Sequence, residues 1–178
     1  RNLKQFFQNQ NASMEAVSKG NLDQHVMISS QDEFSVMGRY TNWMIEMLKK
    51  RKLELEKARR EIVVRLGRAA EYRDNETGMH VIRMSNYSAA LARSAKLPEE
   101  QCDLILQASP MHDVGKIGIR DNVLLKPGKL EGDEWVNMKT HVDIGVSILS
   151  GGDSEIIQLA QEIAATHHEK YDGTGYPN

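Results

Sequence analysis

Apolar residues near the start of the chain recur at alternating steps of four and three residues. Leu3, Phe7, Met14 and Val17 follow this spacing, and polar Gln10 takes the position between Phe7 and Met14. Such a narrow apolar stripe is typical of a coiled-coil seam, and a helix that carries only this stripe needs a partner to bury it. The spacing therefore predicts a helix that packs against another helix.

The same rhythm returns further along the chain. Phe34, Met37, Met44 and Leu48 follow it, with Thr41 as the polar exception. It predicts a second helix of the same kind, which also needs a partner.

The segment between these helices begins with a turn-rich run, Gly20-Asn21-Leu22-Asp23, and continues as an extended stretch over residues 24–30. The expected order is helix, extended connector, helix. An antiparallel hairpin within one chain is the alternative. A hairpin needs only a short loop, however, whereas about a dozen residues separate these helices. The length of the connector favours parallel helices in a dimer.

A continuous helical pattern follows over residues 49–73, which hold ten basic and four acidic residues. A basic helix can bind nucleic acid or a membrane surface. No aromatic residue is interleaved before Tyr72, and glutamates are mixed with the basic residues. The pattern therefore favours a solvated helix face, and no nucleic-acid partner is expected.

Beyond residue 75 the expected helices are shorter and have broader apolar faces. They span roughly 76–95, 99–112, 132–149 and 154–167. The only strand-like run is the brief Val123-Leu124-Leu125. The predicted fold class is all-α.

The composition excludes several classes of protein. Of the 178 residues, 40% are apolar, which is enough for a folded core. The single cysteine, Cys102, excludes a disulfide scaffold and a cysteine-rich zinc module. The net charge of −2 gives no overall attraction to nucleic acid or anionic lipid. Apolar runs reach only three or four residues, whereas a membrane-spanning helix needs about 20, so no spanning segment is expected.

Histidines carry the most informative pattern. Five of the six lie in the last hundred residues: His80, His112, His141, His167 and His168. A lone histidine is usually a hydrogen-bonded core residue. The adjacent pairs His112-Asp113 and His167-His168 are poor core material, because burial of both members requires partners for several polar atoms. Metal ions supply such partners.

Carboxylates accompany these histidines. Glu76 precedes His80 by four residues, which places both on one face of a helix. Imidazoles and carboxylates without a thiolate suit iron, manganese or zinc. Because so many ligands exceed the needs of one ion, two or three divalent metals are expected, and Asp113 can bridge them through its two oxygens. A two-metal site clamps the attacking and leaving oxygens of an in-line phosphoryl displacement.

Two further features lie next to this cluster. Lys116 follows Asp113 by three residues and would meet a substrate phosphate, although a lysine considered alone is more often a surface residue. Residues 167–177 contain two glycines, an aspartate and a proline, which predict a loop. This loop can bring Tyr171 and Tyr176 over the site to stack on a base, or it is a plain surface turn. The pattern leaves these two interpretations open.

Together these segments resemble the HD-GYP family, bacterial phosphodiesterases of the HD superfamily that hydrolyse cyclic di-GMP. The matching motifs are Glu76–His80, His112–Gly118, Val123–Leu130, His141 with Asp143 and Gly145, and His167–Pro177. The resemblance covers about residues 60–178, and the separate motifs agree in order and spacing.

The resemblance implies an HD-type helical bundle with a metal site. Its implied metal ligands are Glu76, His80, His112, Asp113, His141, His167 and His168. Asp113 would bridge two metals, and Glu76 would serve a third. The implied catalytic residues are His112, Asp113 and Lys116, and the implied substrate-binding residues are Lys116, Gly175, Tyr176 and Pro177. Iron or manganese is the expected metal, with zinc as an alternative.

Family members carry a further ligand aspartate and closing helices after the Gly-Tyr-Pro loop, whereas this chain ends at Asn178. The chain is therefore expected to be a fragment of a longer protein, truncated after that loop.

The first part of the chain resembles a HAMP relay module over about residues 1–48. Gly20-Asn21-Leu22 fits the start of its connector, and Asp32-Glu33-Phe34 fits the acidic opening of its second helix. HAMP modules pass a conformational change along a parallel dimer, usually after a membrane helix. The resemblance implies a homodimer through the HAMP-like and coiled-coil helices, and a cytoplasmic portion of a bacterial inner-membrane protein whose membrane segment lies upstream. The expected domains are a relay at 1–48, a helical linker at 49–66 and a phosphodiesterase domain at 67–178.

Two other functions compete with a cyclic di-GMP phosphodiesterase. One is an HD-type phosphohydrolase that acts on another nucleotide, which the Gly-Tyr-Pro loop argues against. The other is a non-catalytic module that binds a nucleotide and only relays a signal, which the intact set of ligands argues against.

Overall fold

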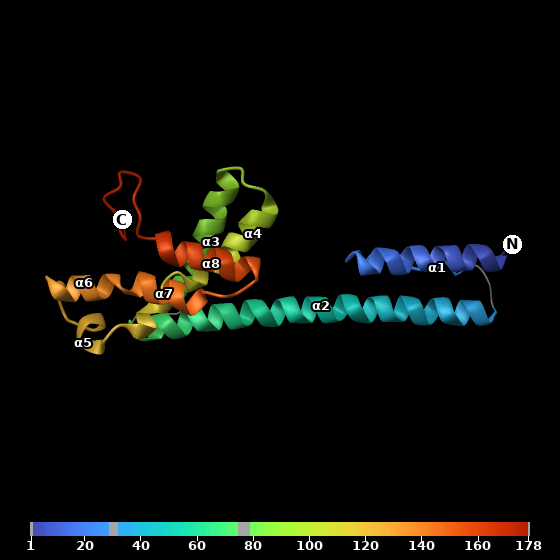
Figure 1. The fold of residues 1–178 in the computed structure, drawn as a ribbon, viewed down its shortest axis with the longest axis horizontal. Coiled ribbons are helices and arrows are strands. Elements are labelled where there is room, and N and C mark those ends of the chain that lie inside the picture. The colour runs from blue at the N-terminus through green and yellow to red at the C-terminus, as the bar shows by residue number, and fades with distance from the viewer. Residues whose placement is uncertain (1, 29–31, 75–78, 178) are drawn as a thin grey trace. The chain divides into compact units, whose positions relative to one another are not determined.

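The computed structural model describes residues 2–28, 32–74 and 79–177, and every regular element in these ranges is a helix (Figure 1). The predicted all-α fold class is confirmed. In chain order the elements are α1 (Asn2–Ser18), α2 (Glu33–Tyr72), α3 (Met79–Ser94), α4 (Glu99–Ala108), the 3₁₀ turns η1 (Ser109–Met111) and η2 (Val114–Gly118), α5 (Asp121–Leu124), α6 (Asp133–Lys139), α7 (His141–Leu149) and α8 (Glu155–Thr166). None of the described helices combines the length and the apolar character that crossing a bilayer requires.

The chain divides into two compact units, Arg1–Ala58 and Arg59–Asn178. The division falls within α2 and within the expected linker of residues 49–66. The three-part division of the chain stays a prediction.

In the first unit, α1 and the first part of α2 run parallel. The rings of Phe6 and Phe34 pack with 5.5 Å between their centroids. One turn further along α1 and two turns further along α2, Gln10 Nε2 donates a 3.4 Å hydrogen bond to Thr41 Oγ1. The two polar exceptions in the apolar pattern therefore face each other, and the contacts advance in the same direction along both helices. The antiparallel hairpin does not occur in this unit.

Asn42 holds the connector against α2. The Val26 N–H donates to Asn42 Oδ1 at 2.7 Å, and Asn42 Nδ2 donates to the Val26 carbonyl at 3.0 Å. The Val26 side chain is buried. An extended segment has no hydrogen bonds of its own, so these side-chain contacts satisfy part of its backbone. Residues 29–31, at the end of this segment, lie outside the described ranges.

The apolar seam of the first unit stays open to solvent within one chain. Five of its residues are 43–48% exposed: Phe7, Met14, Met37, Met44 and Leu48. A single pair of helices therefore leaves this seam without a cover.

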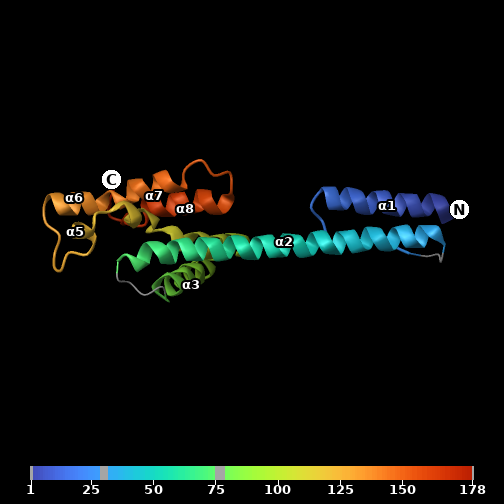
Figure 2. The same ribbon diagram turned by 90° about the horizontal axis from the view of Figure 1, so that it is seen from below.

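The second unit is built around a core of residues from α2, η1, η2, α4, α7 and α8. The core comprises Val63, Ala108, Met111, Val114, Leu149, Ala160 and Ala164. Helices α7 and α8 pack as a hairpin (Figure 2), and α3 packs against α4 (Figure 1). This arrangement brings residues 109–118 between the helices, where they carry the candidate chemistry.

Two local predictions in the second unit are wrong. The strand-like run at 123–125 is not a strand, because Val123 and Leu124 belong to the short helix α5 and pack inward with Ile119. The single helix expected at 132–149 is two helices, α6 and α7, which meet at Thr140. Its N–H donates to the Asn137 carbonyl only three residues back, which tightens the chain before His141.

Backbone contact fixes η2 against α7. A Cβ atom added at Gly115 would lie 1.8 Å from the His141 carbonyl oxygen. Only glycine permits so close an approach. The motif residues around Gly115 are thereby held beside the first turn of α7, which carries His141.

Candidate metal centre

Asp113 lies between η1 and η2 and presents its two carboxylate oxygens to different groups. Oδ1 is 3.4 Å from His141 Nε2 and 3.4 Å from His167 Nε2. Oδ2 is 3.0 Å from His112 Nε2 and 3.1 Å from Lys116 Nζ. The carboxylate therefore stands between two sets of side chains, as a bridging ligand does.

The backbone orients three of the histidine rings. Nδ1 of His112 lies 3.1 Å from the Ser109 carbonyl, and Nδ1 of His141 lies 2.7 Å from the Met138 carbonyl. Nδ1 of His167 lies 3.1 Å from the Ala164 carbonyl. Because a carbonyl only accepts, we assign the hydrogen to Nδ1 in each ring. Each Nε2 is then turned toward Asp113, which is how a protein orients histidine ligands.

His168 completes a compact group. Asp113, His141, His167 and His168 each offer one ligand atom, and these atoms lie within 4.8 Å of one another. Burial, followed by the charges of His167 and His141, lowers the pKa of His168 to about 4. A neutral imidazole is the form that binds a metal.

Charge on Asp113 is strongly favoured. Burial by itself raises the pKa of this carboxyl, but its contacts with His112 and His167 and the charge of Lys116 outweigh burial and hold the pKa well below its usual range. For His112, burial alone lowers the pKa, but the hydrogen bond to Asp113 and its charge raise it overall. The site thus stabilises positive charge beside the carboxylate.

The arrangement of acceptors fits a cation. Burial lowers the pKa of His141, so its Nε2 carries a lone pair. This lone pair faces Asp113 Oδ1, a buried oxygen with no hydrogen-bond partner among the described residues. Two acceptors that face each other without a hydrogen are unfavourable, and a cation between them removes the conflict. Imidazole and carboxylate donors suit iron, manganese or zinc.

Lys116 is held in place by two carboxylates. Its Nζ donates to Asp74 Oδ2 at 2.6 Å and lies 3.1 Å from Asp113 Oδ2. Burial lowers the pKa of Lys116, but the charge of Asp113 and the hydrogen bond to Asp74 outweigh it, so this pKa is raised. The ammonium stays charged beside the cluster.

Arg73 fastens the backbone of the same segment. Its guanidinium donates to the carbonyls of Lys116 at 3.3 Å and Ile119 at 3.0 Å, and it pairs with Asp121. The charge pattern of residues 49–73 predicts a solvated face for Arg73 and gives no sign of Asp74, because charge alone does not reveal a tertiary partner. For Arg73 that interpretation is wrong.

Two predicted ligands remain, His80 and Glu76. His80 lies in the first turn of α3 and is not one of the four residues of the compact group. Its charge lowers the pKa of the Glu71 carboxyl. Glu76 belongs to the helix expected over 76–95 and lies outside the described residues.

The terminal loop folds back onto the histidines. The Tyr176 ring stacks on His168, with 4.4 Å between centroids and 19° between planes. The Tyr176 N–H donates to the His168 carbonyl at 3.3 Å, where Gly175 lies against the backbone. Pro177 and Tyr171 are exposed, so only Tyr176 of the two tyrosines lies over the site.

Trp135 and Lys139 of α6 were not anticipated. Trp135 meets the Tyr176 ring edge-on, with 6.0 Å between centroids, and Lys139 Nζ lies 5.9 Å from the centre of that ring. One signal in the sequence could have indicated this pair: Trp135 and Lys139 are four residues apart, which places them on one face of a helix.

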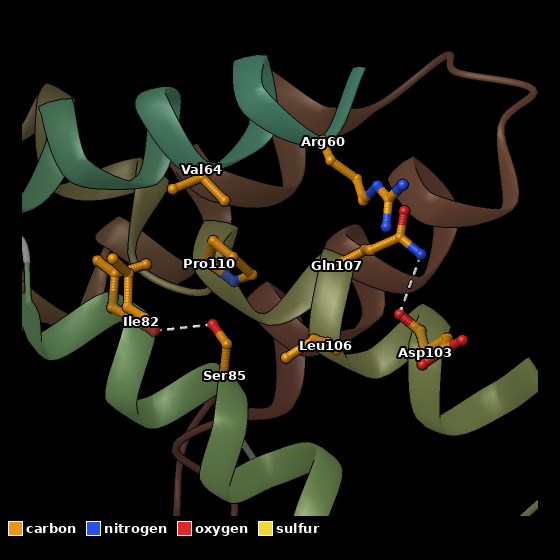
Figure 3. Close-up of a pocket in the computed structure, with 9 residues that line it drawn as sticks. Arg60, Val64, Ile82, Ser85, Asp103, Leu106, Gln107 and Pro110 are labelled. Atoms are coloured by element: carbon orange, nitrogen blue, oxygen red, sulfur yellow. Dashed lines mark hydrogen bonds between the residues drawn. The ribbon is translucent and has the colours of Figure 1, made fainter. Parts of the chain in front are cut away.

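A separate cavity of about 250 Å³ lies between α2, α3 and α4. Figure 3 shows Val64, Ile82 and Leu106 around it, with Gln107 at its polar edge. None of the described ligand candidates lines it, so it is distinct from the histidine cluster.

Comparison with known proteins assigns the family. Residues 77–177, which contain all the clustered histidines, match the HD domain. The chain belongs to the HD domain family. Its HD domain carries the paired His112 and Asp113 at the junction of η1 and η2.

Three relatives are similar to this chain over most of its length. A cyclic di-GMP phosphodiesterase of Vibrio cholerae serotype O1 is 41% identical over 190 residues, which cover 99% of this chain and 39% of that protein. A 3'3'-cGAMP-specific phosphodiesterase 2 of the same organism is 49% identical, over 71% of this chain and 24% of that protein. A cyclic di-GMP phosphodiesterase response regulator of Xanthomonas campestris pv. campestris is 49% identical, over 70% of this chain and 33% of that protein.

These relatives support the HD-GYP branch of the HD family, as the motifs predict. The aligned part of this chain covers between 24% and 39% of the length of each of the three relatives.

Proposed function

We propose that the protein containing this chain is a metal-dependent phosphodiesterase that hydrolyses cyclic di-GMP. The observation that carries the proposal is the position of Asp113, whose two oxygens face separate sets of nitrogen atoms. The substrate is proposed from two relatives of that name, 41% and 49% identical to the chain.

The proposed metal ligands are Glu76, His80, His112, Asp113, His141, His167 and His168. Two or three divalent ions are proposed, iron or manganese, with zinc as the alternative. When bound, such ions activate water and offset the charge of a phosphate group.

The chain's own residues bind and orient the substrate. The Lys116 ammonium, anchored by Asp74, binds a phosphate oxygen of the scissile group and steadies the negative charge that develops there. Tyr176 offers a ring for a base, and the Gly175–Pro177 loop closes over it. His112, Asp113 and Lys116 form the catalytic set.

The test is hydrolysis of cyclic di-GMP by the full-length protein loaded with iron or manganese. The wild type should produce the linear dinucleotide or GMP, and the double variant His112→Ala, Asp113→Ala should be inactive. Retained activity in that variant would exclude the proposed centre. Absence of hydrolysis in the metal-loaded wild type, together with nucleotide binding, would support the non-catalytic alternative.

A second substrate deserves a direct comparison, because one relative with 49% identity is a 3'3'-cGAMP-specific phosphodiesterase. Kinetics on both cyclic dinucleotides, with a mononucleotide ester as a control, decide between them. A higher kcat/KM for 3'3'-cGAMP would overturn the choice of cyclic di-GMP.

We further propose that residues 1–48 are a HAMP-like relay, that 49–66 are a coiled-coil linker, and that 67–178 are the phosphodiesterase domain. The parallel α1 and α2 and their exposed seam support a homodimer. Insertion of two residues after Ala58 rotates the helix by about 200°, and turnover should change. An unchanged rate would contradict coupling.

The HAMP resemblance also supports a place in the cytoplasmic portion of a bacterial inner-membrane protein. Fractionation of cells that express the full-length protein tests this, and recovery only in the soluble fraction would contradict it.

A further inference from the structure

Lys139, the last residue of α6, is a cation that no described carboxylate neutralises. Its side chain is partly buried and forms no ion pair with the residues that the structure describes. Two other lysines of this region are paired, Lys116 with Asp74 and Lys126 with Glu134. The donors of the Lys139 ammonium are therefore available for a ligand.

The Lys139 ammonium approaches the ring that closes over the histidines. Its Nζ lies 5.9 Å from the centre of the Tyr176 ring. His168 covers one face of this ring, with 4.4 Å between the two centroids and 19° between the planes. A ligand that stacks on the uncovered part of the ring comes within reach of Lys139, because the lysine side chain is long and flexible.

Trp135 enlarges the aromatic surface beside Tyr176. It lies one turn before Lys139 on the same face of α6. Its ring meets the Tyr176 ring edge-on, with 6.0 Å between centroids and 78° between planes. The Trp135 side chain is nevertheless 45% exposed, so part of it is free to contact the ring of a ligand. Helix α6 thus brings both an aromatic side chain and a hydrogen-bond donor to the Tyr176 ring.

An ammonium group at this place distinguishes the two purines. It donates hydrogen bonds and accepts none. Guanine presents two neighbouring acceptors, O6 and N7, whereas adenine presents N7 beside the N6 amino group, which is a donor. A lysine at the edge of a stacked purine therefore favours guanine. Stacking itself does not distinguish the purines, because every base has a π-face.

We propose that Lys139 is a specificity-determining residue, which donates to O6 and N7 of a guanine stacked on Tyr176, and that Trp135 completes the stacking surface. The inference rests on the proposed function, because it requires a cyclic dinucleotide at the metal centre. It assigns the selection of the base to α6 and leaves the binding of phosphate to Lys116.

The experiment compares cyclic di-GMP with cyclic di-AMP, which differ only in the base. Values of kcat/KM for both are measured with the metal-loaded full-length wild type and with Lys139→Met, which keeps the length of the side chain and removes its donors. The wild type should prefer cyclic di-GMP, and Lys139→Met should lose about tenfold of this preference. Lys139→Arg, which retains donors, should keep most of it.

Two further variants separate the reading of the base from other roles. Lys116→Met should slow both substrates by the same factor, because the phosphate is common to them. Trp135→Ala should raise KM for both substrates equally, because stacking tolerates either base. Wild-type KM values in Trp135→Ala would overturn the role of Trp135.

An unchanged preference in Lys139→Met would overturn the role of Lys139, and so would a wild type that does not prefer cyclic di-GMP. Equal losses on both substrates in that variant would show a phosphate contact and would also overturn it. Circular dichroism checks that each variant folds. If Lys139→Met does not fold, Lys139→Gln should show the same loss of preference, because its amide both donates and accepts.

The proposed function can fail separately. If the wild type hydrolyses cyclic di-GMP alone, the inhibition constant of cyclic di-AMP supplies the comparison. If it hydrolyses neither dinucleotide, the proposed function is overturned, and the ratio of the two dissociation constants, measured by calorimetry, still tests Lys139. Binding of neither dinucleotide would overturn both proposals.

Discussion

Gly115 lies against the carbonyl of His141 so closely that a methyl group has no room, since an added Cβ atom would be 1.8 Å from that oxygen. This contact connects the segment that carries Asp113 and Lys116 to the helix that carries His141. The proposed metal centre therefore depends on a backbone contact between η2 and α7, in addition to the proposed ligands themselves.

Gly115→Ala should therefore separate η2 from α7. We expect a loss of at least about 2 kcal/mol of unfolding free energy, because the clash is with backbone atoms. Gly145→Ala is the control at the same interface, since its Cβ would meet Ala164 Cβ at an ordinary 3.5 Å. Denaturant unfolding of both variants tests this, and equal stability of the two would contradict it.

The stacking of Tyr176 on His168 predicts a role in base binding. Tyr176→Ala should raise KM for the cyclic dinucleotide, since stacking on an aromatic ring contributes about 1–3 kcal/mol per base. Tyr176→Phe keeps the ring and should retain most of the affinity. Steady-state kinetics on the metal-loaded full-length protein measure this. A KM for Tyr176→Ala equal to that of the wild type would exclude the ring as a base platform.

Lys116 and Asp74 should act as a coupled pair. Lys116→Met should lower kcat/KM by about 100-fold, because one charge-stabilising donor is lost. Asp74→Asn keeps the ammonium but loosens its position and should cost less. Asp74→Asn should have almost no further effect when Lys116→Met is already present, because the anchor then has nothing to position. Full additivity of the two losses would contradict the pairing.

His168 predicts how the metal-free protein responds to acid. Its pKa is about 4 in the folded protein and 6.5 in the unfolded chain, so the unfolded state binds more protons between these values. The stability that neutral His168 provides is therefore present above pH 6.5 and is lost as the pH falls toward 4. His112, with a raised pKa, acts in the opposite direction.

The matching measurement is denaturant unfolding of chelated protein at pH 7.5 and 5.5. His168→Gln should lose less stability than the wild type over this step, because one of the responding groups is gone. An equal loss in the two proteins would show that His168 is not the group that responds.

Much of the site was predictable because its residues lie in short motifs. The pairs His112-Asp113 and His167-His168 and the single His141 converge, and the loop around Tyr176 closes on them. These side chains could be selected because adjacent polar residues at helix ends are difficult to bury without a common partner.

The missed features depend on tertiary contacts that no local pattern encodes. Glu71, in the last turn of α2, and Arg73, just after this helix, belong to a basic segment whose pattern predicts a solvated face, yet Glu71 is buried and Arg73 donates to backbone carbonyls. The apolar pattern predicts one helix over 132–149, but the chain turns at Thr140 and forms two helices. This turn does not change the spacing of the apolar residues, so the pattern does not reveal it. The positions of Glu71, Arg73 and Thr140 follow from the packing of η1 and η2 against the helices, which the local sequence pattern does not show.

The most direct test of the metal centre is a metal count on the full-length protein and on Asp113→Ala. The wild type should hold two or three divalent ions per chain. Because one carboxylate is proposed to contact two of them, its loss should remove more than one ion, while exposed Asp103→Ala on α4 should remove none. Equal metal content in the wild type and Asp113→Ala would contradict the account.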